Sequence, residues 1–424
     1  QVYEEAMEFF YSPEVENDVK NLPLRDMFVE RFRVSIMESH IFKAKFTEED
    51  EKRIRKLIRE WYGDDGNPAG DDLESYIGSM YRKYLMGEED IRIVIGKVIE
   101  RILAERPHPD YARQSREDFM TLTTYLSTVS EIIEMIKYAR IPFEEKKELA
   151  MRIIPEANAL IREIPYPFYP EMLNPDIAQI FGHIRPFFEG EEECIEEIMN
   201  LIIRRQPITY IHSLMVSEIV TVITREAIKE LSEQFIGILG INNAADVSKM
   251  REEILKFIKT GALLHDIGKC NITDVINRQS RRLTDDEFSM IKWHPFLGRK
   301  LTDKMPELAK YGDLIEGHHR SYDGKSGYPS QFDIVKSPYR FLIDILSIAD
   351  STDAATDILG RNYAKGKDFY SVLSELSAGK GTRYNPDLVT MIEKNRSLQD
   401  ELYRMTSDGR YDTYYMAYMD IVGE

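Results

Sequence analysis

The sequence predicts an all-α protein built from two domains. Apolar residues recur at helical spacing along most of the chain, with neither a β-hairpin turn signal nor a repeated β–α–β pattern among them. The chain is 424 residues long, which exceeds what one hydrophobic core usually fills. A turn-rich stretch at residues 165–176 precedes an acidic run at 189–197, so we expect a boundary near residue 200, between domains 1–200 and 201–424.

Residues 47–61 and 91–102 carry the clearest helical patterns of the front domain. In the first segment the apolar side chains share one face, and Thr47 with Asp50 resembles the capping box that starts many helices. In the second, apolar residues recur at the same spacing, although the run IRIVI alone is also compatible with a strand. We expect both segments to be helices that bury one face.

The back domain shows the same periodicity. Apolar residues between 216 and 227 predict one helix, and Thr284 with Glu287 caps another. That second helix should carry Phe288, Ile291 and His294 on one face. After about residue 396 we expect a packing helix with buried tyrosines. These tyrosines are Tyr403, Tyr411, Tyr414, Tyr415 and Tyr418.

Charge and cysteine content exclude several classes of protein. The chain has 74 acidic and 56 basic side chains and a formal charge of −18, which opposes nonspecific binding to nucleic acids and docking on anionic membranes. No stretch approaches 18 uninterrupted apolar residues, so we expect no membrane span. Cys194 and Cys270 are too few for a disulfide framework, which indicates a reducing, cytoplasmic compartment, although one bridge between them stays open.

Histidines concentrate in the back domain. Of eight in the chain, five lie between positions 212 and 319, where an even distribution would place about two. These five are His212, His265, His294, His318 and His319. A single histidine on an apolar face is most often a core residue, but an adjacent His–Asp pair, an adjacent His–His pair and two further histidines call for one explanation.

The His265–Asp266 pair lies in LLHDIGK, where an apolar helical run ends. We expect Gly268 to take the left-handed conformation that commonly follows a helix, so that the pair lies in the last turn. Neutral imidazoles and a carboxylate suit iron, manganese, nickel or zinc. Two such ions about 3.5–4 Å apart can bind a phosphoryl oxygen and generate hydroxide at neutral pH.

Four segments in order along the chain resemble the HD-GYP family, a branch of the HD phosphohydrolases that hydrolyse cyclic di-GMP. The resemblance covers roughly residues 205–395, and the ordered series is far more specific than an HD pair alone. The segments are LLHDIGK (263–269), LTDDEFSMIKWHPFLG (283–298), GHHRSYDGKSGYP (317–329), and SIADSTDAATD (347–357) with RNYAK (361–365).

The resemblance implies two divalent transition-metal ions. Iron or manganese is favoured, and nickel or zinc is the alternative. One ion would be held by His212, His265, Asp266 and Asp350, and the other by His294, His318 and His319, with Asp266 bridging. Lys269 would lie beside the bridging hydroxide and act with Asp266 in catalysis, whereas the alternative for this lysine is a solvated surface amine. The candidate substrate contacts are Arg361, Lys365, Arg320 and Tyr328.

The sequence also departs from the family pattern. Ile208 stands where some members have a glutamate that helps to bind a third metal, which favours two metals and a linear product. Arg320 replaces the usual glutamate after the His–His pair, and the loop DGKSGYP is one residue longer than usual. Asp353 and Asp357 share a helix face with Asp350. They would either hydrogen-bond to metal ligands or form a solvated face.

These features predict a metal-dependent phosphodiesterase that opens the ring of a cyclic dinucleotide, with cyclic di-GMP favoured. The alternatives are another cyclic dinucleotide or nucleotide phosphate as substrate, or a weakly active sensor or partner-binding module. For the front domain we expect a regulatory or oligomerising role, by analogy alone. A homodimer stays open, as does a signalling partner at the loop of Gly327, Tyr328 and Pro329.

Overall fold

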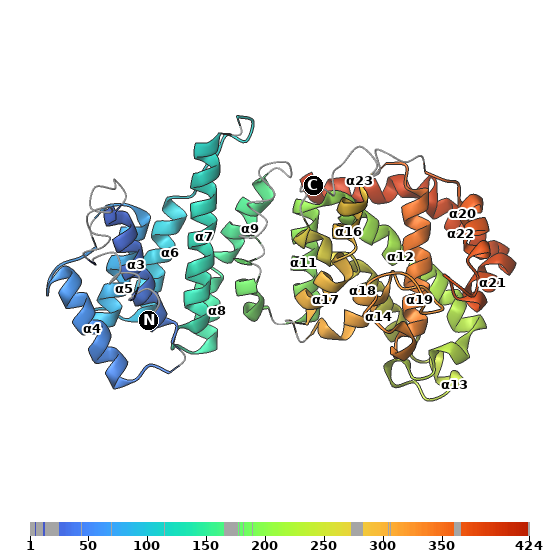
Figure 1. Cartoon of the computed structure of the whole chain (residues 1–424), viewed down its shortest axis with the longest axis horizontal. Coiled ribbons are helices and arrows are strands. Elements are labelled where there is room, and N and C mark those ends of the chain that lie inside the picture. Colours follow the sequence, from blue (N-terminus) through green and yellow to red (C-terminus); the bar gives the residue numbers. More distant parts are fainter. Residues whose placement is uncertain are drawn as a thin grey trace. The chain divides into compact units, whose positions relative to one another are not determined.

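The computed structural model describes most of the chain and divides it into two compact units, residues 1–189 and 190–424 (Figure 1). We call these the front unit and the back unit. The described residues are Glu5, Ser12 and 25–422, except 44, 69, 114, 165–176, 178, 181, 189, 273–282, 304, 306 and 360–365. Within them no strand occurs and only two isolated β-bridges are present, which confirms the all-α prediction.

The front unit is helical. Its main helices are α3 (Arg25–Ile41), α4 (Glu48–Tyr62), α5 (Leu73–Met86), α6 (Ile91–Ala104), α7 (Arg116–Tyr138), α8 (Phe143–Ala150) and α9 (Ile154–Glu163). The Thr47–Asp50 capping box is present at the start of α4. Residues 91–102 form α6 rather than a strand, because Val94, Val98 and Ile102 line a single buried helix face.

The described part of the back unit is helical too. They are α11 (Glu191–Arg205), α12 (Pro207–Glu230), α13 (Ala244–Val247), α14 (Arg251–Leu264), α16 (Asp285–Ile291), α17 (His294–Thr302), α18 (Gly312–Gly317), α19 (Arg340–Thr356), α20 (Phe369–Ala378), α21 (Pro386–Lys394), α22 (Arg396–Thr406) and α23 (Gly409–Val422). Short 3-10 helices lie between some of them, including η4 (Ile267–Asn271) and η5 (Ala309–Tyr311). Residue 200, where we expected the boundary, lies inside α11.

Helix α12 is the central element of the back unit. It contacts α11, α14, α19, α22 and α23, and its side chains from Tyr210 to Ile228 are largely buried. By length and composition α12 could cross a membrane, although polar residues interrupt its apolar sequence and we expected no membrane span. However, 61% of its most apolar stretch is buried inside the unit, as in the core helix of a folded domain.

One local prediction in the back unit is wrong. The helix capped by Thr284 and Glu287 ends at Ile291, and His294 begins α17 instead of continuing the same face. Helix α16 buries none of its residues, so Phe288 is exposed.

The C-terminal segment also differs from the prediction. It forms two helices, α22 and α23, and Tyr403, Tyr411, Tyr415 and Tyr418 are all exposed. Leu398, Leu402 and Ala417 bury its apolar face, and Arg410 is 1% exposed. The exposed tyrosines lie outside that buried face.

Gly268 has a different role from the one expected. Its φ is not positive. Helix α14 ends at Leu264, and a turn leads directly into η4, which contains Gly268. A Cβ at this position would lie 1.9 Å from the carbonyl oxygen of His294 and 2.5 Å from the nitrogen of Gly298. The glycine is therefore required because the backbones of η4 and α17 approach each other closely.

Candidate metal centre

Five helical elements of the back unit meet at a buried cluster of histidines and aspartates. Helices α12, α14, α18 and α19 contact one another in sequence around it, and α17 contacts both α18 and η4 (Figure 1). All seven predicted metal ligands lie in this cluster. They are His212 on α12, His265 and Asp266 between α14 and η4, His294 at the start of α17, His318 and His319 after α18, and Asp350 on α19.

The first group of ligands surrounds His212. Its Nε2 atom lies 3.1 Å from Asp350 Oδ1, 3.3 Å from His265 Nε2 and 3.5 Å from Asp266 Oδ2. Ligand atoms of His212, His265 and Asp350 all lie within 4.8 Å of one another. This spacing is compatible with one shared metal ion.

The second group consists of His294, His318 and His319, whose ligand atoms also lie within 4.8 Å of one another. His294 Nε2 is 3.2 Å from His318 Nε2 and 3.0 Å from Asp266 Oδ1. Asp266 thus directs one oxygen toward each group, as a bridging carboxylate would. Asp350 does likewise, because its Oδ2 lies 3.5 Å from His319 Nδ1.

Hydrogen bonds at Nδ1 orient three of the rings. His265, His294 and His318 lie with Nδ1 at 2.6, 2.8 and 2.7 Å from the carbonyl oxygens of Ala262, Ile291 and Ile315. A carbonyl accepts only, so Nδ1 carries the proton in each ring and Nε2 presents a lone pair to the cluster. This arrangement is the usual one for metal-binding histidines.

The atoms that face the centre of the cluster are placed favourably only if positive charge lies among them. The Nε2 lone pairs of His294 and His318 face each other at 3.2 Å, an unfavourable contact unless a positive charge lies between them. Asp266 Oδ1 is buried and has no hydrogen-bond partner. A buried carboxylate oxygen costs stability unless a hydrogen bond or a bound cation compensates it. Two divalent ions held by these residues would satisfy both requirements.

The protonation states of most candidate ligands favour the same chemistry. His212 is the exception, because burial lowers its pKa but hydrogen bonds to Asp350 and Asp353 outweigh burial and raise it to about 9. Burial lowers the pKa of His265 and His318, and it lowers that of His319 to about 3, so these rings stay neutral. Burial alone would raise the pKa of Asp350 and Asp266, but neighbouring histidines, and Lys269 in the case of Asp266, hold both below the usual range. Neutral imidazoles and ionised carboxylates are the forms that bind metal.

A second layer of charged residues supports His212. Its Nδ1 lies 2.6 Å from Asp353 Oδ2, and Asp353 Oδ1 is 2.9 Å from the Nη2 atom of Arg410 on α23. Arg410 also donates to Thr356 Oγ1 at 2.8 Å and lies near Asp357, which Tyr414 contacts. Of the two readings of Asp353 and Asp357, the buried arrangement behind the cluster is the one observed. No local sequence pattern indicates a role for Arg410.

Lys269 lies against the carboxylate of Asp266. Its Nζ donates to Asp266 Oδ2, and its carbonyl oxygen accepts from Gln206 Nε2 at 2.6 Å. The side chain is 22% exposed, so the ammonium is neither free in solvent nor sealed away. This placement differs from that of a solvated surface amine.

The candidate substrate contacts have different surroundings. Arg320 is buried and donates to the carbonyl oxygens of Gly327 and Gly324 at 3.0 and 2.6 Å, so its guanidinium holds the loop together. The ring of Tyr328 lies at the cluster, 4.5 Å from that of His319 between centroids. Arg361 and Lys365 lie outside the described residues.

Comparison with known proteins agrees with this geometry. Residues 222–388 match a family described as HD domain. A cyclic di-GMP phosphodiesterase of Thermotoga maritima is 31% identical over 166 residues, 39% of this chain and 44% of that protein. The cyclic di-GMP phosphodiesterase response regulator RpfG of Xanthomonas campestris is 30% identical over 36% of this chain and 40% of its own length.

A third relative has a different named substrate. The 3'3'-cGAMP-specific phosphodiesterase 2 of Vibrio cholerae is 30% identical over 34% of this chain and 27% of its own length. The chain thus covers less than half of each of these three relatives. The similarity shows that the back half of the chain carries an HD domain at residues 222–388, and the relatives named as cyclic di-GMP phosphodiesterases support its resemblance to the HD-GYP family.

Proposed function

We propose that the back unit is a metal-dependent phosphodiesterase that opens the ring of a cyclic dinucleotide to give the linear dinucleotide, with cyclic di-GMP as the first candidate substrate. The observation that carries this proposal is the position of Asp266 between two groups of inward-pointing imidazoles. Relatives named as cyclic di-GMP phosphodiesterases support the substrate class.

The cluster would hold two divalent ions, with Asp266 shared between them. Such ions act as Lewis acids on a phosphoryl oxygen and supply hydroxide at neutral pH. The protein's own residues would orient the metal ligands and compensate the charge of the phosphate. Asp353 and Arg410 keep the His212 ring fixed, and the Lys269 ammonium, beside Asp266, would donate to a phosphate oxygen or to the departing ribose oxygen.

The surroundings of the cluster favour a single cleavage. Ile208, at the position where some family members have a third-metal ligand, is 45% exposed and offers no donor atom. A two-ion site fits one ring-opening reaction. We therefore expect the linear dinucleotide, rather than the mononucleotide, to accumulate.

The test combines metal analysis with product identification. His265→Ala and Asp266→Ala in the full chain should each lose bound metal and hydrolysis of cyclic di-GMP together, because both residues contribute to the cluster. His108→Ala is a matched control, since that histidine is exposed and belongs to the front unit. Full activity in either cluster variant would refute the site.

A second candidate substrate deserves the same assay, because one relative is named for 3'3'-cGAMP. Turnover rates for cyclic di-GMP and 3'3'-cGAMP on one metal-replete preparation would rank the two. Saturable binding of both without any product would instead favour the sensor alternative.

A further inference from the structure

The front unit contains a cavity that has no part in the metal centre. It has a volume of about 390 Å³ and lies where α3 contacts α5 and α7. Cavities of a few hundred Å³ are the size that holds small ligands. Helix α3 contributes Arg31, Val34 and Glu38, α5 contributes Glu74 and Ile77, and α7 contributes Thr123 and Glu131.

Negative charge exceeds positive charge in this cavity. Arg31 pairs with Glu131 at 2.6 Å and with Glu74 at 3.4 Å. Glu38 adds a third carboxyl group, so one guanidinium faces three acids among the lining residues. An anion would meet repulsion here, whereas a cation would be attracted.

Two buried polar atoms in the cavity wall lack partners. Glu38 is 9% exposed, and its Oε1 atom has no hydrogen bond. The Oγ1 atom of Thr123 is likewise buried without a partner. Burial, with the charge of Glu131 adding to it, raises the pKa of Glu38 to about 8. Unsatisfied buried groups cost stability, and a bound donor would remove that cost.

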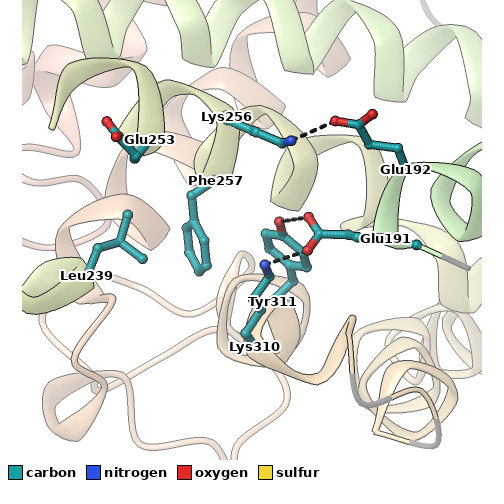
Figure 2. A pocket seen from close by; sticks show the side chains of 9 residues that line it. Glu191, Glu192, Leu239, Glu253, Lys256, Phe257, Lys310 and Tyr311 are labelled. Carbon is teal, nitrogen blue, oxygen red and sulfur yellow. Dashed lines mark hydrogen bonds and ion pairs between the residues drawn. The ribbon is translucent and has the colours of Figure 1, made fainter.

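A cavity in the back unit provides a contrast. Four of its five charged residues are joined in pairs, as Figure 2 shows: Lys256 to Glu192, and Lys310 to Glu191, which also accepts from Tyr311. Glu253 lies apart from these pairs in Figure 2. None of the side-chain atoms that line it is buried without a partner. Both of its lysines are paired and its lining contains no buried polar side-chain atom in need of a partner, so that cavity gives no indication of a ligand.

We propose that the front-unit cavity binds a small organic cation, an amine or guanidine on a short aliphatic chain. The cation would donate to Glu38 Oε1 and Thr123 Oγ1, and its chain would lie against Val34 and Ile77. A metal ion fits less well, because Glu38, Glu74 and Glu131 do not bring three oxygens within 4.8 Å of one another.

Isothermal titration of the full chain with agmatine and putrescine tests the proposal, with succinate as a probe of opposite charge. At pH 9, where Glu38 is ionised, at least one of the amines should bind saturably, and Glu38→Gln should weaken its binding about tenfold or more, the effect of losing a charge-assisted hydrogen bond. Thr123→Val should weaken binding less. Glu117→Gln, an exposed glutamate on the same helix as Thr123, should bind as the unchanged protein does.

Three results would overturn the proposal: no saturable binding of either amine, equal affinity in Glu38→Gln, or preferential binding of succinate. Far-UV circular dichroism establishes that each variant is folded. If Glu38→Gln does not fold, Thr123→Val decides, and undiminished affinity in that variant overturns the proposal. The outcome is independent of hydrolysis by the back unit, because no cyclic dinucleotide is used.

Discussion

The Lys269 ammonium is the charged group nearest to the bridging carboxylate that is not itself a candidate metal ligand. We expect Lys269→Met to reduce kcat for cyclic di-GMP about 100-fold or more, the effect typical of losing a catalytic proton donor. Two ions per chain should remain bound, because the seven ligands are unchanged. Metal analysis and steady-state kinetics on the same sample measure both quantities.

Lys249→Met is the control for that experiment, since Lys249 is 77% exposed and pairs only with Asp246 three residues earlier. If Lys269→Met loses its metal, the lysine supports the carboxylate rather than the reaction. If kcat is unchanged, its proposed role in catalysis is wrong.

The buried side chain of Glu38 should make the stability of the protein depend on pH, and this can be measured without a ligand. Its pKa rises from 4.5 to about 8 because of burial, with Glu131 and Glu74 opposing and Arg31 favouring ionisation. The folded protein thus keeps a proton that the unfolded chain loses above pH 4.5. The stabilising contribution is complete below pH 4.5 and declines as pH rises through about 8.

Glu38→Gln removes this titration. The variant should be more stable than the unchanged protein at pH 9 by on the order of 2 kcal/mol, with a much smaller difference at pH 5. Urea unfolding of the front-unit transition at both pH values measures it. An equal difference at the two pH values would contradict the assignment.

At the scale of elements, α23 acts on the metal centre through one side chain. Arg410 is buried against Asp353, which in turn fixes the His212 ring. We expect Arg410→Met to weaken metal binding by about 10- to 100-fold, as loss of an outer partner of a metal ligand usually does. It should also destabilise the back unit by roughly 3–5 kcal/mol, because Asp353 would be left buried without its partner.

Metal titration and thermal unfolding measure the two effects of Arg410→Met. Arg404→Met is the control, because Arg404 is exposed on the neighbouring helix α22. Unchanged metal affinity in Arg410→Met would mean that α23 stabilises the fold without supporting the site.

Helix periodicity and short motifs predicted part of this arrangement. The capping boxes at Thr47 and Thr284 are local patterns, and both helices begin where they were expected. The contact between Arg410 and Asp353 joins residues 57 positions apart, with no pattern of spacing to indicate it. Gly268 was misread for a related reason, since the close approach of η4 and α17 is a tertiary contact.

At the scale of the whole molecule, the two units have separate cores. The all-α class could be predicted because apolar residues recur at helical spacing along the buried face of each helix. That spacing indicates a helix even where the ends of the helix are predicted wrongly. The seven candidate ligands could be selected because they occur in motifs with a fixed order, and they lie together in the structure. The cavity around Glu38 could not be predicted, because its walls come from three helices without any motif.

Separate cores predict two unfolding transitions in scanning calorimetry. Removing metal with a chelator should lower the midpoint of one transition by about 10 °C, because ligands at 1,000 times their dissociation constant add about 4 kcal/mol to stability. The other transition should not move. His265→Ala should lack the metal-dependent shift. A single transition, or a shift of both, would show that the units unfold together.

The place of Arg410 in the chain has a consequence for biosynthesis. Every candidate metal ligand precedes Asp353, but Arg410 follows Asp353 by 57 residues. At 5–20 residues per second, a ribosome needs about 3–11 s to add that segment. During this interval Asp353 lacks the cation that it contacts in the finished protein. The nascent chain therefore completes the charged surroundings of His212 only after every candidate metal ligand has been made.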